Sequence, residues 1–181
     1  MHARESLKQR RSVIRQPHHP QPHPIGPGQE SVWDYPRPAI CEPTQRRIQI
    51  IHRGATLLDS CKAWRTLETS HPPTYYIPRS DIAMDLLSRN RRRSLCEWKG
   101  QASYWDVEIE GDRFEATAWC YEKPTSSFAP IAGYLAFYPE PFNQCLVDGH
   151  EILPQPGGFY GGWISPFEAG PFKGIPGSRF W

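Results

Sequence analysis

The chain has 181 residues, of which 38% are hydrophobic and 13% aromatic, and its net charge is +2. This length predicts one domain with a tail, while twenty prolines and fourteen glycines exclude a fold of long helices. Residues 1–30 hold five basic and two acidic residues, which leaves 16 basic and 17 acidic residues for the remainder. A nearly neutral core argues against nucleic acid as a partner.

The N-terminal residues 1–29 have the composition of a disordered tail. The run QPHHPQPHPIGPGQ is rich in proline and histidine and cannot bury apolar surface. The remaining residues, 30–181, are predicted to form a single β-rich domain. The sequence has no run of about 18 apolar residues that would cross a membrane, so we expect a cytoplasmic protein without a membrane partner. The Arg-rich segment ARESLKQRRSVIRQ leaves a mitochondrial presequence as the alternative.

The cysteines predict reduced thiols and no metal site. There are five of them, an odd number, and no two are closely spaced. Structural zinc sites normally contain a C-x-x-C pair or close His and Cys spacing, so we expect neither a metal nor a cofactor. Cys96 and Cys120 could be nucleophiles, but their strand neighbours favour buried structural thiols.

The first predicted elements are a hairpin and a short helix. Two alternating apolar runs flank Arg53-Gly54 within residues 46–60, which is typical of a β-hairpin. Asp59 or Ser60 could cap a helix over residues 61–71. Helical spacing would place four residues on one face, namely Cys61, Trp64, Glu68 and His71. Pro72 would end the helix, and residues 75–78 are predicted to be extended.

The rest of the chain is predicted to be mainly strands. Residues 79–90 could form one or two helical turns, with Ser80 as the cap. Strand-like runs follow over residues 94–100, 102–111, 112–124 and 131–139. Glu110-Gly111 and Asp148-Gly149 predict hairpin turns, and residues 157–181 predict a loop that wraps the core. We therefore expect an all-β domain, a compact antiparallel twisted sheet or barrel-like arrangement closed by one short helix.

The pair Glu68 and His71 is the first candidate for catalysis. A carboxylate close to an imidazole raises the pKa of the imidazole and orients its tautomer, so the two could act as general base and acid. The alternative is that they cap and brace the end of the helix before Pro72. A Glu-x-x-His pair also occurs in di-iron sites, but those require further helices that supply glutamates.

Lys99 and a set of aromatic residues complete the candidate site. Lys99 follows a strand at a glycine turn, where it could bind an anionic group or act as a nucleophile, or simply be solvated. Aromatic side chains could line a pocket, although each could equally be core. The predicted substrate-binding residues are Trp64, Tyr75, Tyr76, Trp98, Tyr104, Trp119, Tyr121, Tyr134 and Arg47. The basic cluster of residues 89–93 is predicted to be a solvated loop, with nucleic-acid binding through the cluster and the basic tail as the alternative.

Several blocks of the sequence resemble the domain-of-unknown-function family numbered 427, which is sometimes labelled a nucleotidyltransferase family. The blocks are ESVWDYPRP, LETSHPPTYY, CEWKGQASYWDV, AWCYEKP, IAGYLAFYP and PQPGGFYGGW. The resemblance extends from Glu30 to the C-terminus and implies a compact β-rich, Mss4-like fold, without implying an established reaction. The sequence lacks a Walker-type loop and a Gly-Ser loop with paired acidic residues, so it does not support the nucleotidyltransferase label.

Two functions follow from these residues. The first is a small-molecule enzyme that uses metal-independent acid–base chemistry in an aromatic pocket, as an isomerase, lyase, cyclase or hydrolase. In it, Glu68 and His71 would transfer protons, and Lys99 and Tyr121 would orient the substrate. The alternative is a module that binds a small ligand or a partner segment without converting it.

Overall fold

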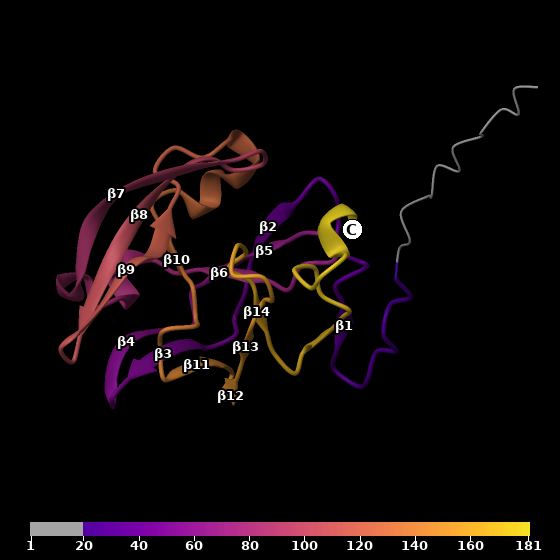
Figure 1. The fold of residues 1–181 in the computed structure, drawn as a ribbon, viewed down its shortest axis with the longest axis horizontal. Helices are drawn as coiled ribbons and strands as arrows, with labels where there is room; N and C mark the ends of the chain where they lie inside the picture. Colours follow the sequence, from indigo (N-terminus) through magenta and orange to yellow (C-terminus); the bar gives the residue numbers. More distant parts are fainter. Residues whose placement is uncertain (1–19) are drawn as a thin grey trace, which may run out of the picture.

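The computed structural model describes residues 20–181, and most of its regular structure is strand (Figure 1). Two four-stranded antiparallel sheets form the larger part. One has the order β10-β9-β8-β7 and comprises β7 (Leu87–Cys96), β8 (Gly100–Ile109), β9 (Asp112–Cys120) and β10 (Leu135–Phe137). The other has the order β12-β11-β3-β4 and comprises β3 (Ile48–His52), β4 (Ala55–Ser60), β11 (Gln144–Val147) and β12 (His150–Glu151).

Shorter elements surround these two sheets. A three-stranded antiparallel sheet has the order β2-β5-β6 and comprises β2 (Ile40–Pro43), β5 (Trp64–Leu67) and β6 (Thr74–Tyr76). Two further pairs are β13 (Leu153–Pro154) with β14 (Trp163–Ile164), and β1 (Glu30–Ser31) in parallel with β15 (Glu168–Ala169). The helical turns are 3₁₀: η1 (Arg79–Asp81), η2 (Met84–Leu86), η3 (Ser126–Ile131) and η4 (Ser178–Phe180).

The strands β8, β9 and β10 separate two hydrophobic clusters, because successive side chains of a strand point to opposite faces. Trp105, Val107 and Ala118 join a core that also takes Ile48 and Ile50 from the other four-stranded sheet. The opposite face carries the second cluster, whose members include Ala102, Tyr104, Trp119, Tyr121 and Ala136. The candidate site described below lies on this second face.

The three predicted hairpin turns are confirmed. Arg53 and Gly54 have φ values of 46° and 84°, Glu110 and Gly111 of 50° and 80°, and Asp148 and Gly149 of 51° and 79°. Positive φ at both central residues is the requirement of a type I′ turn, whose twist matches that of the flanking strands. The all-β prediction is confirmed as well, with separate sheets rather than a closed barrel among residues 20–181. The Mss4-like topology stays a prediction.

The predicted helix over residues 61–71 is wrong. The segment instead contains β5, which is the central strand of its sheet and pairs with both β2 and β6. Short apolar runs fit helix and strand periodicity about equally, and here pairing on both sides decides for the strand. Ser60 therefore caps no helix: it belongs to β4 and its Oγ accepts a hydrogen bond from the Lys62 amide at 3.1 Å.

Two smaller predictions also need correction. The helical turns after residue 78 are present as η1 and η2, but the residue at the N-terminal cap of η1 is Pro78 rather than Ser80. The arginine cluster of residues 89–93 is not a loop, because it lies within the edge strand β7, where a β-bulge interrupts the pairing with β8 between Arg89 and Arg93. A bulge at a sheet edge bends the strand and lets its side chains turn outward.

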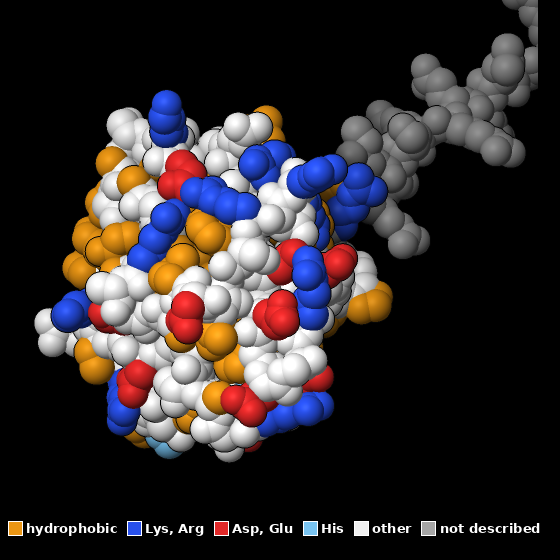
Figure 2. Space-filling view, turned by 90° about the vertical axis from the view of Figure 1, so that its left-hand side faces the viewer, with side chains coloured by type: hydrophobic (Ala, Val, Ile, Leu, Met, Phe, Trp, Pro, Cys, Tyr) orange, Lys and Arg blue, Asp and Glu red, His pale blue; other side chains and the backbone are white. Residues whose placement is uncertain are grey.

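The surface that carries β7 has mixed charge. Figure 2 shows blue and red side chains interspersed on this face, with orange hydrophobic groups between them. Arg89 lies 2.7 Å from Glu122, and Arg113 lies 2.9 Å from Asp106. Arg89 of this edge strand and Arg113 of β9 are therefore each paired with a carboxylate.

Residues near both ends of the described chain pack against the domain. The His23 amide donates to the Gly170 carbonyl at 2.7 Å, and Gln29 Nε2 donates to the Pro166 carbonyl at 2.9 Å. The rings of Trp33 and Trp181 pack with centroids 5.6 Å apart. The predicted tail falls, for residues 1–19, outside the described residues. Within residues 20–181 no helix is long and apolar enough to span a membrane.

Candidate functional site

A pocket of about 470 Å³ lies on the second face of the β7–β10 sheet. The three-stranded sheet forms its opposite wall, the β7–β8 turn lies at one side, and the loop of residues 155–161 lies at another. Ligand pockets commonly have volumes of about 300–1,000 Å³. Eight residues proposed from the sequence line it: Glu68, His71, Lys99, Tyr76, Trp98, Tyr104, Trp119 and Tyr121.

Glu68 and His71 are brought together by a turn and not by a helix. The His71 amide donates to the Glu68 carbonyl at 3.0 Å, and Ser70 between them has φ of 69°. Such a hydrogen bond between residues i and i+3 closes a β-turn. The Glu68 carboxylate is 22% exposed and accepts a hydrogen bond from Arg37 at 3.2 Å. Arg37 is fixed in turn, since it also donates to the main-chain oxygens of Thr69 and Trp181.

The His71 side chain has a different partner, Gln155. Gln155 Nε2 lies 2.9 Å from the Lys173 carbonyl oxygen and 2.9 Å from His71 Nδ1. Because a carbonyl only accepts hydrogen bonds, the atom facing it must be the amide nitrogen, and that nitrogen donates its second hydrogen to Nδ1. His71 is therefore the tautomer that carries its proton on Nε2.

The environment keeps His71 neutral. Burial lowers the pKa of His71 from 6.5 to about 3, with further lowering by the positive charges of Lys173 and Arg37. The Tyr160 ring packs edge-on against the imidazole, with centroids 4.7 Å apart. The expectation that a carboxylate would raise the His71 pKa is thus corrected, because the side chain bonded to the ring is an uncharged amide. At neutral pH His71 can donate a hydrogen bond from Nε2.

Lys99 enters the pocket from the turn between β7 and β8. Its carbonyl accepts a hydrogen bond from the Thr125 amide at 3.2 Å, which fixes the turn, and its Nζ lies 5.3 Å from the centroid of the Phe128 ring. Its side chain is half-buried and forms no ion pair with a carboxylate of residues 20–181. Lys99 is thus a positive charge available to a ligand.

Aromatic rings that pack against one another form the apolar wall. Trp119 contacts Tyr138 with centroids 4.5 Å apart, and its Nε1 donates to the Tyr76 hydroxyl at 3.3 Å. Burial raises the pKa of both Tyr76 and Tyr121, so their hydroxyl groups stay protonated. Burial also raises the pKa of Tyr138, to about 12.

The loop of residues 155–161 contacts this aromatic wall through Gly161. A Cβ atom at Gly161 would lie 2.1 Å from the Trp119 ring, closer than any side chain permits. The backbone of Gly161 therefore rests directly on the indole. This close approach fixes one edge of the pocket.

The other residues proposed from the sequence lie outside the pocket lining. Tyr75 neighbours Tyr76 in β6 and so points to the opposite side, where it packs against Trp163 at 5.8 Å. Trp64 and Tyr134 are half-buried and pack around the second hydrophobic cluster. Arg47 forms an ion pair with Asp59 on the exposed side of the β3–β4 hairpin.

Sequence reasoning missed several lining residues, among them Arg92, Tyr138, Gln155, Phe159 and Tyr160. Gln155 is the most important, because it fixes His71 from 84 residues away. Residues 157–181 are predicted only as a loop that wraps the core, although the glycines of GGFYGG could have indicated a close backbone approach. No comparable signal marked Gln155.

The sequence matches the profile of a protein family over much of its length. That family is NTP_transf_9, described as Domain of unknown function (DUF427), and the match covers residues 40–148. The chain belongs to this family. A search of curated proteins found no significant match.

The DUF427 match supplies only part of the pocket. Glu68, His71, Lys99 and the aromatic wall lie within residues 40–148, whereas Gln155, Tyr160 and Gly161 follow it and Arg37 precedes it. The segments that flank the matched DUF427 region therefore complete the polar end of the site.

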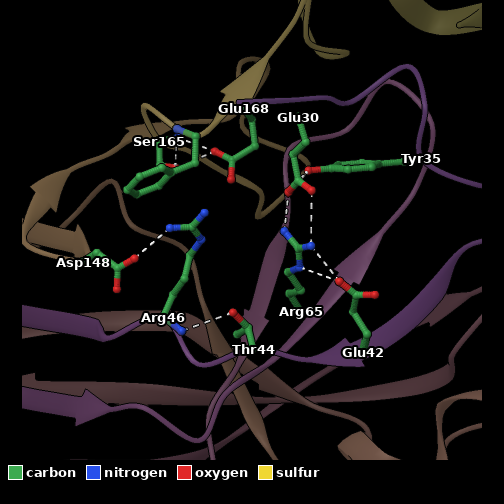
Figure 3. Close-up of polar contacts among 10 residues, drawn as sticks. Glu30, Tyr35, Glu42, Thr44, Arg46, Arg65, Asp148, Ser165 and Glu168 are labelled. Atoms are coloured by element: carbon green, nitrogen blue, oxygen red, sulfur yellow. Dashed lines mark hydrogen bonds and ion pairs between the residues drawn. The ribbon is translucent and has the colours of Figure 1, made fainter. Parts of the chain in front are cut away.

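A second, polar cavity of about 400 Å³ lies beside Gln29, Glu42, Arg46 and Arg65. Figure 3 shows how its charges are paired: Arg65 reaches both Glu30 and Glu42, and Arg46 reaches Asp148. Tyr35 donates to Glu30 at 2.7 Å. Because β1, β2 and β5 each supply one member, this network ties the three strands together, and its charges already have partners.

Cys96, for which a buried thiol is predicted, is only half-buried and lines the pocket. Among residues 20–181 no group of three or more His, Cys, Asp or Glu side chains could hold a metal ion. The five cysteines are free, and Cys120 and Cys145 are buried. Burial raises the pKa of Cys120 to about 11, which keeps this thiol protonated and unreactive.

Proposed function

We propose that this pocket binds a small organic molecule and transfers a proton to or from it. The observation that supports the proposal is the convergence of Glu68, His71 and Lys99 on one aromatic-lined cavity of about 470 Å³. A concave apolar site with a few polar groups at one end is typical of small-molecule sites. The reaction class is an isomerisation, elimination, cyclisation or hydrolysis.

The polar groups have distinct roles in this proposal. The Glu68 carboxylate, held by Arg37, is the proton acceptor. His71 is a neutral hydrogen-bond donor through Nε2, because Gln155 occupies Nδ1 and the pKa of His71 is lowered to about 3. Lys99 attracts a polar or negative group of the substrate, and the protonated hydroxyl of Tyr121 orients it.

The proposal is tested by exposing the protein to a mixture of small metabolites and following the masses of substrates and products. Wild-type protein should convert at least one compound, and Glu68→Gln should lower that conversion by about 100-fold or more while the compound still binds. Glu115→Gln, an exposed change in β9, is the matched control and should retain activity. Undiminished conversion by Glu68→Gln would rule out the assigned base.

One observation favours a second candidate, a binding module without catalysis. Glu68 is already engaged by Arg37 at 3.2 Å, and an ion pair can serve to shape a pocket as well as to position a base. In this case a compound retained by the protein is recovered unchanged. Glu68→Gln would then alter affinity or stability alone.

A further inference from the structure

The polar end of the pocket carries positive charge that no carboxylate of residues 20–181 neutralises. Arg37 is paired with Glu68. Lys99 forms no ion pair in this part of the chain, and Arg92 at the pocket edge lies over the Tyr104 ring, 4.5 Å from its centroid. Lys173, behind Gln155, already has a partner, because its Nζ donates to the main-chain oxygen of Trp181 at 2.9 Å. Against Lys99 and Arg92 the lining offers one further carboxylate, the exposed Glu97.

The neutral His71 adds a donor to this positive region. Its Nδ1 accepts from Gln155, so Nε2 carries the hydrogen. Burial lowers the pKa of His71 most, and the positive charges of Lys173, Arg37 and Lys99 lower it further, so positive groups surround the imidazole. A ligand group placed there is best stabilised when it accepts hydrogen bonds and carries negative charge.

The remaining walls favour a flat apolar body. Trp119 is held between the Tyr76 and Tyr138 rings and the Gly161 backbone. Because this packing leaves Trp119 only 6% exposed, the half-buried Tyr138 is the surface on which a flat ring can stack, in offset or edge-on geometry. Two hydrophobic side chains at the pocket, Leu95 and Phe159, are 82% and 75% exposed and would be partly covered by a ring that extends to the mouth.

We propose that the ligand of this pocket is an aromatic carboxylate, with its ring against the half-buried Tyr138 and its carboxylate bound by Lys99 and by His71 Nε2–H. This inference rests on the proposed function, since it names the class of molecule that the pocket takes. The negative charge of Glu68 does not oppose it, because Arg37 compensates that charge.

The experiment compares matched ligands that differ only in the charged group. 3-Phenylpropanoate, 3-phenylpropanamide and 3-phenylpropylamine, with the corresponding indole compounds, are titrated into ¹⁵N-labelled protein at low salt. Binding is located by amide shifts of residues that line the pocket. The carboxylates should bind there about tenfold more tightly than the amides, and the amines most weakly, because a hydrogen bond to a charged group is the stronger one.

Variants of Lys99 test whether this residue binds the carboxylate. Lys99→Met should abolish the preference for the carboxylate, and Lys99→Arg should retain it. Lys62→Met, at a lysine whose side chain is 77% exposed and which is not among the lining residues, should leave the preference unchanged. An amide or an amine that binds at the pocket as tightly as its carboxylate would overturn this inference while leaving the proposed function standing. If no compound of either series shifts the pocket residues, this inference is overturned, whereas the proposed function is decided by the conversion assay with Glu68→Gln.

Discussion

Gln155 Nε2 lies 2.9 Å from His71 Nδ1, and this one hydrogen bond determines how the imidazole is used. Gln155 is 2% exposed, and its amide is oriented by the Lys173 carbonyl. The ring is therefore held with its proton on Nε2. A residue from the C-terminal segment thus sets the chemistry of a residue in the turn after β5.

Replacing Gln155 with Glu should reverse the state of His71. A carboxylate beside Nδ1 stabilises the imidazolium, so we expect the pKa of His71 to rise from about 3 toward or above its usual value. The measurement is a pH titration of the imidazole nitrogens by NMR. Gln101→Glu, at an exposed position of β8, is the matched control and should leave the His71 titration unaltered. A His71 that still titrates near its wild-type pKa in Gln155→Glu would show that the amide does not govern it.

The lowered pKa of His71 also predicts a pH dependence of stability. Between pH 6.5 and about 3 the unfolded chain binds a proton on this residue that the folded chain does not. The contribution of neutral His71 to the free energy of unfolding is therefore fully present above pH 6.5. It decreases as the pH falls, by at most about 1.4 kcal/mol per pH unit. The measurement is the free energy of unfolding in urea from pH 7.5 to 4.5, for wild type and His71→Gln.

The variant lacks this titration, so wild type should lose stability more steeply than His71→Gln across that range. A difference between the two proteins that stays constant with pH would contradict a buried, neutral His71.

Gly161 should tolerate no side chain. The Cβ of Gly161→Ala would meet the Trp119 ring at 2.1 Å, and relief of such a clash requires the loop or the indole to move, at a cost of about 1–3 kcal/mol. We expect the unfolding free energy to fall by this amount and the tryptophan fluorescence spectrum to shift. Gly54→Ala provides the comparison, because it has open space around the Cβ and bears only the strain of its φ of 84°. An unchanged fluorescence spectrum in Gly161→Ala would argue against this contact.

The ion pairs of Arg65 should contribute more to stability than the ion pair of Arg47. Its side chain is 14% exposed and bridges Glu30 and Glu42 (Figure 3). Arg65→Met would leave both carboxylates without their partner, and because each is more than a third exposed we expect a loss of about 2–3 kcal/mol rather than the full cost of a buried pair. Arg47→Met removes an ion pair whose arginine is 54% exposed and should change stability little. Equal losses in the two variants, measured by urea unfolding, would contradict this difference.

The strands and turns could be predicted from the sequence where local chemistry decides them. Arg53-Gly54, Glu110-Gly111 and Asp148-Gly149 specify tight turns through their backbone preferences, and alternating residues around Trp119 specify a strand. The segment with Glu68 could not be predicted in this way. The strand β5 in this segment pairs with β2, which lies upstream in the sequence, and with β6, which lies downstream. This pairing on both sides overrides the helix-like spacing of Trp64, Glu68 and His71.

The candidate site was predicted in part. Glu68, His71 and Lys99 do line one pocket, but the arrangement depends on contacts across long stretches of chain. Tyr75 and Tyr76 could not be assigned to the pocket or the core before the register of β6 was known. Arg37 and Gln155, which fix the orientation of the two polar residues, have ordinary neighbours in sequence. Their roles arise only from the fold.

If the aromatic cavity binds a small molecule, a variant that fills the cavity should lose that molecule. Thr74 of β6 lines the cavity, so Thr74→Phe should fill it, whereas Thr56→Phe places the same side chain on an exposed position of β4. Each protein is incubated with a metabolite extract, separated from free compounds and analysed by mass spectrometry. We expect wild type and Thr56→Phe to retain the same compound and folded Thr74→Phe to retain none. Equal retention by all three proteins, or retention by none, would contradict this expectation.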